Sequence, residues 1–378
     1  MSARDERRVP AGWPAQRGGQ SIQVNESGAA RPVWLSRALV PAVVVVLAVA
    51  ALLAALWKFR GFDWARFWAT FQSMDPAWLA AAVGLSFLSY PGRALRWRAL
   101  IKPQKADASF WRLLDATVIG FSAAVLFGRA GEMVRPYLIA KKEGLSFSSQ
   151  VGAWLLERIY DLLMVLLIFG FALTKVRGAE AQVGPTIHLV LETGGFIVGA
   201  LSALCLGLLV VLGRFSESAE RRIKDALEVL PDTMRARCRS LLGSFVQGVA
   251  STKSRLVIAE IVGLSLFEWI LFVAVVYCLM LAVPMGRKFE PADAATFLGF
   301  VSFGAIFQVP GIGGGVQVAS AVVLTQLFGL SLEAASGFAL LFWLVSFVMI
   351  VPVGLALAFR EGLRLGALRQ MGEEASKD

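Results

Sequence analysis

Charged side chains interrupt an apolar run between residues 151 and 173. Glu157, Arg158 and Asp161 lie inside this run. Glu157 and Asp161 are four residues apart, so on a helix they share one face. A charged side chain near the centre of a membrane helix costs about 2.5–3.5 kcal/mol on insertion scales. We therefore expect these side chains to face protein or a water-filled cavity, with partners of opposite charge.

A second charged stretch offers such partners. Residues 128–136 read Gly-Arg-Ala-Gly-Glu-Met-Val-Arg-Pro and follow another apolar run. Arg129 and Arg135 are the natural partners for the two acids, and Glu132 is the natural partner for Arg158. An ionic network of this kind can simply hold helices together, or it can bind a ligand and exchange a proton. The residue types alone leave both roles open.

Two further arginines follow the second apolar run. Arg93 and Arg96, in the stretch Arg-Ala-Leu-Arg-Trp-Arg, are three residues apart and lie on one helical face. The guanidinium fork matches phosphate oxygens, so a lipid phosphate at the inner leaflet is a suitable ligand. The alternative is plain anchoring of the span by positive charges and an interfacial Trp.

Glycine and proline interrupt two apolar segments, one in each half of the chain. The residues at these breaks are Gly128 and Gly131, and Pro310, Gly311, Gly313, Gly314, Gly315 and Gln317. Paired breaks are typical of discontinuous helices that surround a site near the middle of the membrane. Amides freed at a half-helix N-terminus attract anions. Ordinary glycine turns at the membrane surface are the alternative.

The composition of the whole chain indicates a membrane protein. Of the 378 residues, 57% are hydrophobic and only 17% are charged, whereas soluble domains are about 25% charged. The apolar runs are continuous rather than alternating, which argues against an outer-membrane barrel. One His and three Cys without ligand spacing predict no metal site, no cofactor and no disulfide framework.

The predicted fold is all-α and polytopic, with about six full spans and two re-entrant helical hairpins. The spans are expected at 39–57, 78–90, 151–173, 187–212, 256–283 and 332–359. The hairpins are expected at 110–134, entering from the cytoplasm, and at 292–330, entering from outside. An inverted repeat is one arrangement that the paired breaks allow.

Most Lys and Arg residues of the loops fall on the side of the two termini. The positive-inside rule then places both termini in the cytoplasm, in a bacterial inner membrane. The net charge of +10 fits anionic lipid headgroups better than nucleic acid. We expect a disordered cytoplasmic tail at 1–36, a helical membrane domain at 37–360 with an amphipathic cytoplasmic hairpin at 214–252, and a second cytoplasmic tail at 361–378.

The order of these motifs resembles a known family. Arg-x-x-Arg-Trp after the second span, Gly-Arg-x-Gly-Glu-x-x-Arg-Pro, Glu-Arg-x-x-Asp and a late Pro-Gly-x-Gly-Gly segment are similar to the flippase-like integral membrane family. That family is typified by the membrane half of lysylphosphatidylglycerol synthase. The resemblance covers the chain from about residue 35 to about residue 365. It implies movement of phospholipids or glycolipids between leaflets. Relatives often carry an acid soon after the glycine segment, where this chain has Gln317.

The resemblance and the residues together predict a lipid translocase that moves or presents an anionic phospholipid or glycolipid. The predicted phosphate-binding residues are Arg93, Arg96, Arg129, Arg135 and Arg158, and the acids that hold them or exchange a proton are Glu132, Glu157 and Asp161. The expected partners are membrane lipids and a separate lipid-modifying enzyme. Because only a short charged tail follows Phe359, we expect no soluble catalytic domain and no enzyme activity.

Two other functions fit the same residues. The chain would be a non-catalytic membrane subunit for a separate glycosyltransferase or lipid synthase, recognisable by co-purification. Alternatively it would be a membrane transferase acting on a polyprenyl-phosphate lipid, with Glu157 or Asp161 as the base. Turnover of covalent bonds would identify the transferase.

Overall fold

A computed structural model describes residues 61–177, 185–213, 243, 254–284, 288–306, 308–309 and 313–363. The predicted first span at 39–57, both predicted tails apart from residues 361–363, and nearly all of the predicted hairpin at 214–252 lie outside the described residues. Pro310 and Gly311 also lie outside them.

The described part of the chain is helical, as predicted, apart from one short strand pair. The helices in the first half are α2 (Trp64–Gln72), α3 (Pro76–Ile101), α4 (Phe110–Phe127), α5 (Arg129–Glu132), α6 (Val134–Glu143), α7 (Phe147–Arg177) and α8 (Pro185–Gly213). Those in the second half are α11 (Arg255–Ala282), α12 (Pro291–Val301), α13 (Gly315–Gln326), α14 (Leu332–Trp343) and α15 (Val351–Arg360). A 3₁₀ turn, η4 (Ser302–Ile306), follows α12, and a π-helical turn, η5 (Leu344–Val348), joins α14 to α15. Strand β1 (Gln308–Val309) pairs antiparallel with β2 (Gly313–Gly314).

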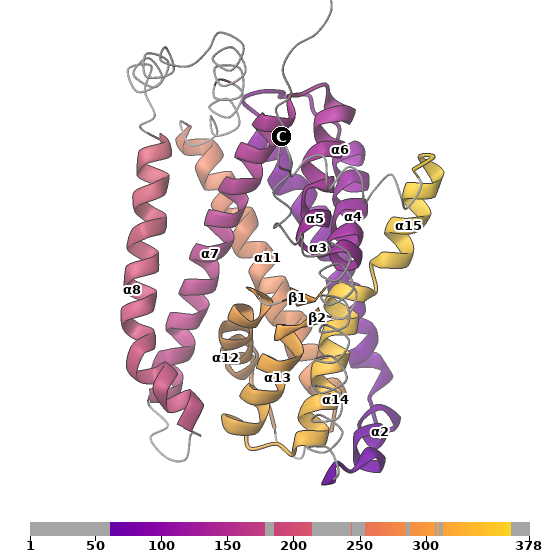
Figure 1. Cartoon of the computed structure of the whole chain (residues 1–378), viewed down its shortest axis with the longest axis vertical. Coiled ribbons are helices and arrows are strands. Elements are labelled where there is room, and N and C mark those ends of the chain that lie inside the picture. The colour runs from indigo at the N-terminus through magenta and orange to yellow at the C-terminus, as the bar shows by residue number, and fades with distance from the viewer. Residues whose placement is uncertain are drawn as a thin grey trace, which may run out of the picture. The chain divides into compact units, whose positions relative to one another are not determined.

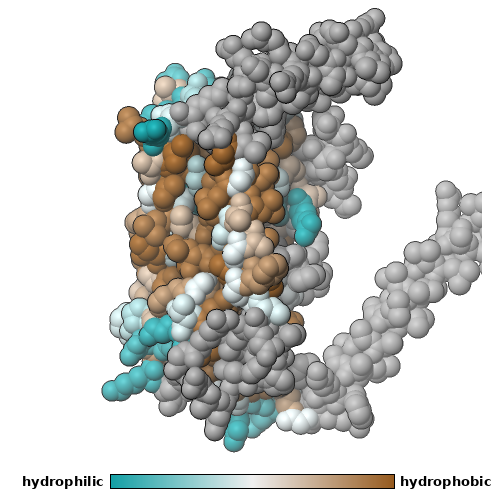
Figure 2. Space-filling model, turned by 90° about the vertical axis from the view of Figure 1, so that its left-hand side faces the viewer, coloured by the Kyte–Doolittle hydropathy of each residue, from teal (hydrophilic) through white to brown (hydrophobic). Residues whose placement is uncertain are grey.

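Five helical segments in the described part are long and apolar enough to cross a membrane. They are Phe110–Phe127, Phe147–Val176, Thr193–Val210, Arg255–Ala282 and Leu332–Arg360. Figure 2 shows one face of the molecule, on which apolar side chains form a broad band between hydrophilic ends. Continuous apolar helices with satisfied backbones are what a bilayer requires. The chain is therefore a multi-pass helical membrane protein.

Helix α3 differs from the sequence prediction. The second span was expected to end at Pro91-Gly92, but α3 continues through Pro91 to Ile101 and packs along α11. Proline removes one backbone hydrogen bond from a helix. The residues beyond it offset that loss, because Arg96, Trp97 and Leu100 are fully buried. The continuation carries Arg93 and Arg96 into the interior of the helix bundle.

Helices α4, α5 and α6 form the first predicted helical hairpin. The chain reverses at Gly128, whose φ of 63° favours glycine, and α6 packs back against α4 (Figure 1). The returning arm runs to Glu143, farther than the predicted limit at 134. A Cβ at Gly131 would stand 2.1 Å from the carbonyl oxygen of Ala123, so the turn admits no side chain there. The hairpin brings Arg135 over α7.

Helices α12 and α13 form the second hairpin around η4 and the strand pair. Gly314 has a φ of 114°, and its N–H donates to Oε1 of Gln317 at 2.6 Å. Gln317 therefore closes the N-terminus of α13. A Cβ at Gly304 would stand 2.5 Å from the carbonyl oxygen of Gly315, so the two arms meet closely.

Two large buried clusters and one small one, around Tyr90, Val118 and Ile350, form the core of the described part. One large cluster gathers Phe297, Phe338 and Phe342 from α12 and α14, with the Phe297 and Phe338 rings edge to face at 5.5 Å. The other large cluster gathers Trp97 from α3 and Leu156 from α7 with residues of α4 and α6. In Figure 1, α8 runs beside α7. Only 11% of the apolar segment Thr193–Val210 of α8 is buried, as expected for a helix that faces lipid.

Candidate functional site

Arg96 lies at the centre of a buried ionic cluster. Its Nη1 is 2.6 Å from Oδ1 of Asp161, and its Nη2 is 2.8 Å from Oε1 of Glu157 and 3.2 Å from Oε2 of Glu268. The hydroxyl of Ser265 lies 3.3 Å from Nη1. The side chain of Arg96 is 0% exposed. An arginine enclosed by three carboxylates holds α3, α7 and α11 together, and it has no open side toward a ligand.

Arg135 forms the pair that the sequence predicted with an acid of α7. Its Nη1 lies 2.9 Å from Oε2 and 3.1 Å from Oε1 of Glu157. Its Nη2 donates to the carbonyl oxygen of Arg93 at 3.1 Å, and its guanidinium carbon lies 4.2 Å from the centre of the Trp97 ring. Arg135 therefore connects α6 to α7 and α3.

Arg93 points toward the same cluster but keeps part of its donor set free. Its Nε lies 3.0 Å from Oε1 of Glu268. Its guanidinium carbon lies 4.2 Å from the Phe121 ring centre and 5.0 Å from that of Phe272, which adds cation–π attraction. Among the described residues, none accepts a hydrogen bond from its Nη1 or Nη2. Arg93 is thus fixed by Glu268 and the aromatic rings, and its Nη1 and Nη2 remain able to donate to a ligand.

Arg158 pairs within its own helix. Its Nη2 lies 3.2 Å from Oδ2 of Asp161 and 3.5 Å from Oε2 of Glu157, and its side chain is 40% exposed. The prediction that Glu132 pairs with Arg158 is wrong, because no ion pair joins them in the described part of the chain. Arg158 instead meets acids one and three residues away on α7, which need no tertiary contact to reach it.

Glu268 of α11 was missed by the sequence reasoning. Its side chain is 2% exposed and pairs with both Arg93 and Arg96. The available signal was the same as for Glu157, namely an acid inside the apolar run at 256–283. An acid in such a run is costly unless it meets a cation.

The glycine breaks and Arg129 lie outside the ionic cluster formed by Arg93, Arg96, Arg135 and Arg158 with their acids. Arg129 begins α5, is exposed, and is not among the residues that line the cavity described next. Gly128 and Gly314 shape the two hairpins through their positive φ angles. From the second break, Val316 reaches the cavity wall.

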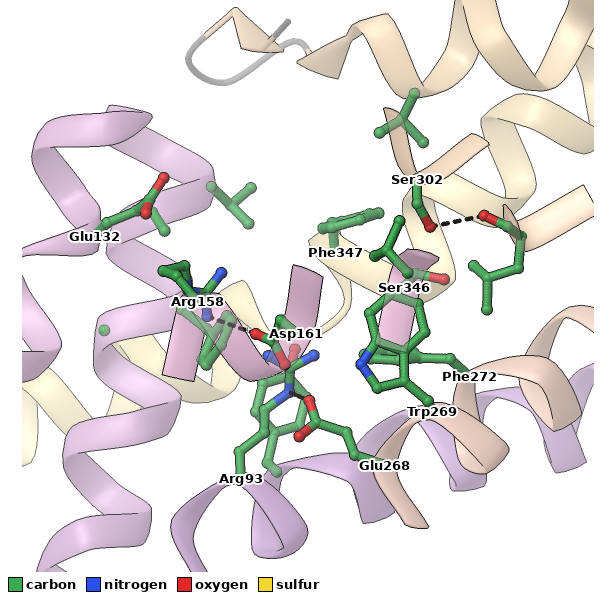
Figure 3. Close-up of a pocket in the computed structure, with 18 of the residues that line it drawn as sticks. Arg93, Glu132, Arg158, Asp161, Glu268, Trp269, Phe272, Ser302, Ser346 and Phe347 are labelled. Atoms are coloured by element: carbon green, nitrogen blue, oxygen red, sulfur yellow. Dashed lines mark hydrogen bonds and ion pairs between the residues drawn. The ribbon is translucent and has the colours of Figure 1, made fainter. Parts of the chain in front are cut away.

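A cavity of about 360 Å³ opens beside the ionic cluster. Its charged lining consists of Arg93, Glu132, Arg135, Arg158, Asp161 and Glu268. The rest is largely aromatic or aliphatic, with Trp269, Phe272 and Phe347 facing the charged side (Figure 3). A pocket that is mostly apolar with a few convergent polar groups is the usual form of a small-ligand site. Here the convergent groups are three arginines and three acids beside an apolar wall.

Comparison with known proteins agrees with this architecture. The family model described as "Lysylphosphatidylglycerol synthase TM region" matches residues 41–354. A curated relative, "Glycosyltransferase AglD" of Haloferax volcanii, is 30% identical over 122 residues, which is 32% of this chain and 19% of the relative. The chain thus matches about a fifth of that relative's length. No solved structure matches the chain significantly. Because the family match covers most of the sequence, the chain belongs to the lysylphosphatidylglycerol synthase TM region family.

Proposed function

We propose that the protein binds an anionic phospholipid or glycolipid by its phosphate and moves it between leaflets, or presents it to a partner. The observation that carries this proposal is the free donor set of Arg93 inside a cavity that Arg158 also lines. Arginine nitrogens held in place but not hydrogen-bonded match phosphate oxygens. The surrounding apolar helices suit the acyl chains of a lipid.

The remaining charges support these two arginines. Arg96 forms ion pairs with Glu157, Asp161 and Glu268, and Arg135 forms one with Glu157. These pairs hold the helices in position. The ion-paired cluster holds four arginines and three acids, and Glu132 on the cavity wall balances the formal charges, so attraction of an anion depends on the Nη atoms of Arg93 rather than on net charge. Glu132 lines the same cavity and is the acid best placed to compete with a phosphate or to exchange a proton.

The two helical hairpins would act as re-entrant segments that line the path of the headgroup. Each reverses at a glycine with positive φ, and non-helical backbone at membrane depth is tolerated only inside protein or beside water. The same proposal places both termini in the cytoplasm of a bacterial inner membrane. It assigns no catalytic step to Glu157, because this carboxylate already accepts hydrogen bonds from three arginines.

Retention of lipid by the purified protein tests this proposal. Native mass spectrometry would follow detergent-solubilised protein that has been incubated with equal amounts of phosphatidylglycerol and phosphatidylcholine of the same chains. We expect phosphatidylglycerol to be retained preferentially, since only its headgroup brings a net negative charge. Equal retention, or none, would contradict binding through the arginines.

A second function is favoured by one specific observation. The relative named a glycosyltransferase shares only a fifth of its length with this chain, so the shared part is a piece of a larger protein. A membrane subunit that serves a separately encoded glycosyltransferase or lipid synthase would fit that relationship. Affinity purification of the tagged full chain from its native membrane would recover such an enzyme at a fixed stoichiometry.

A further inference from the structure

Six buried polar atoms of the cavity-lining residues lack hydrogen-bond partners among the described residues, and four of them belong to the ion-paired side chains of Arg93, Arg135, Arg158 and Glu268. The other two belong to uncharged side chains: Nε1 of Trp269 on α11 and Oγ of Ser346 in the π-helical turn η5. Both residues line the cavity, on the side away from Glu132 and Arg158 (Figure 3). Buried polar groups are nearly always satisfied, so an unsatisfied pair that shares one pocket calls for a partner outside the protein chain.

Three other Trp and Ser side chains of the described part show how such groups are satisfied within the protein. The buried indole N–H of Trp97 donates to Oε1 of Gln150 at 3.0 Å. The hydroxyls of Ser302 and Ser320 each donate to the carbonyl four residues before them, at 2.7 Å. Trp97, Ser302 and Ser320 thus find protein partners in the described part of the chain, whereas Trp269 and Ser346 do not.

The local backbone explains why Ser346 remains free. It lies in a π-helical turn, where the ordinary spacing of helical carbonyls is changed, and such turns are frequent at functional sites. The neighbouring carbonyl of Val345 accepts a hydrogen bond from Ser86 of α3 at 2.9 Å, which anchors the turn to α3. Trp269 is held by edge contact with Phe272, with ring centres 5.6 Å apart. Both polar atoms are therefore fixed in place on the cavity wall.

We propose that Trp269 and Ser346 bind a hydroxyl group of the lipid headgroup, while Arg93 and Arg158 hold its phosphate. This inference rests on the proposed function and names the substrate class: a lipid phosphodiester whose headgroup is a polyol or a sugar. The indole N–H only donates, so it needs an acceptor oxygen, which a hydroxyl supplies and an ammonium group does not. A cavity of about 360 Å³ is in the usual size range of small-ligand sites and accommodates a headgroup of this kind.

A competition between lipids of equal chain length tests the inference. Phosphatidylglycerol, phosphatidic acid and phosphatidylethanolamine would be added in equal amounts to the purified full chain, and retained lipid would be measured by native mass spectrometry. We expect phosphatidylglycerol to be preferred over phosphatidic acid. The variants Trp269→Phe and Ser346→Ala should each reduce that preference about fivefold, which is the typical worth of one hydrogen bond. Retention of phosphatidic acid should stay at the wild-type level in both.

The controls separate this inference from the proposed function. Trp111→Phe removes an indole N–H from a residue that is 71% exposed and outside the cavity, and it should leave the preference unchanged. Equal retention of phosphatidylglycerol and phosphatidic acid by wild type, or full preference in Trp269→Phe, would overturn hydroxyl recognition while anionic lipid binding stands. Retention of no anionic lipid would overturn both. Soluble glycerol 3-phosphate should not displace the lipid, and displacement would overturn the assignment to a lipid.

Discussion

Nη1 of Arg135 lies 2.9 Å from Oε2 of Glu157, and neither side chain is more than 5% exposed. The pair joins the returning arm of the first hairpin to α7. Glu157 also receives Nη2 of Arg96 at 2.8 Å, so one carboxylate connects α3, α6 and α7. The geometry of the cavity therefore depends on this acid, although Glu157 itself is not among the residues that line the cavity.

Removing this acid should be severely destabilising. Glu157→Ala leaves two buried arginines underpaired, and breaking a buried pair in this way costs about 3–5 kcal/mol. The measurement is unfolding of the purified protein in detergent by heat or denaturant. The matched control is Glu260→Ala, which removes the partner of Lys102 from a half-exposed pair worth about 0–1 kcal/mol. Similar losses in the two variants would show that the cluster is not a buried network.

The close approach of α4 and α6 gives a second prediction. A Cβ at Gly120 would stand 2.4 Å from Cβ of Arg135, so Gly120→Ala must push the helices apart and shift Arg135 from Glu157. We expect a clear fall in thermal stability. Gly84→Ala is the control, because no atom lies within 4 Å of its added Cβ and alanine favours a helix by about 1 kcal/mol. A stabilised Gly120→Ala variant would contradict the observed packing.

Much of this arrangement could be predicted from the sequence, since membrane burial makes charges and glycines costly. From that cost the ion pair between Glu157 and Arg135 and the chain reversal at Gly128 were predicted correctly. It did not identify pairs that depend on how distant helices pack. Glu268 was missed, and Glu132 was paired with Arg158 wrongly, because the arginine finds acids on its own helix.

Helix α3 illustrates the same limit. The local preference of Pro91 predicts a helix end, but burial of the following turns against α11 prevails. The continuation buries Arg96 among three acids. The sequence alone predicted instead that Arg96 binds a lipid phosphate at the membrane surface. Tertiary packing, which no local pattern encodes, thus decides which arginines support the site and which face the cavity.

The proposed phosphate site predicts a specific loss of binding. Arg158→Gln removes a charge that faces the cavity, and a charge-assisted hydrogen bond is worth about 1.5–3 kcal/mol, so retained phosphatidylglycerol should fall at least about tenfold. Arg360→Gln is the control, because Arg360 is 68% exposed and pairs with Asp115 outside the cavity lining. An equal loss in both variants would indicate a general effect of charge on lipid association.

The orientation of the chain gives a further prediction. Ser73 and Ala106 flank opposite ends of α3, which is about 40 Å long at 1.5 Å per residue, and both are exposed. In a background without Cys205, Cys238 and Cys278, a single cysteine at position 106 should react with an impermeant reagent only from the cytoplasm. One at position 73 should react only from outside. The reverse pattern would overturn the cytoplasmic placement of both termini.

Leaflet exchange in reconstituted vesicles tests the central proposal most directly. Tail-labelled phosphatidylglycerol would be incorporated into vesicles with wild-type protein, with Arg158→Gln, or with no protein, and an impermeant quencher would report the fraction that reaches the outer leaflet. We predict exchange well above empty vesicles for the wild type and a loss of about tenfold for Arg158→Gln. No exchange above empty vesicles with wild-type protein that still retains the lipid would contradict transport and favour a membrane subunit that presents the lipid to a partner.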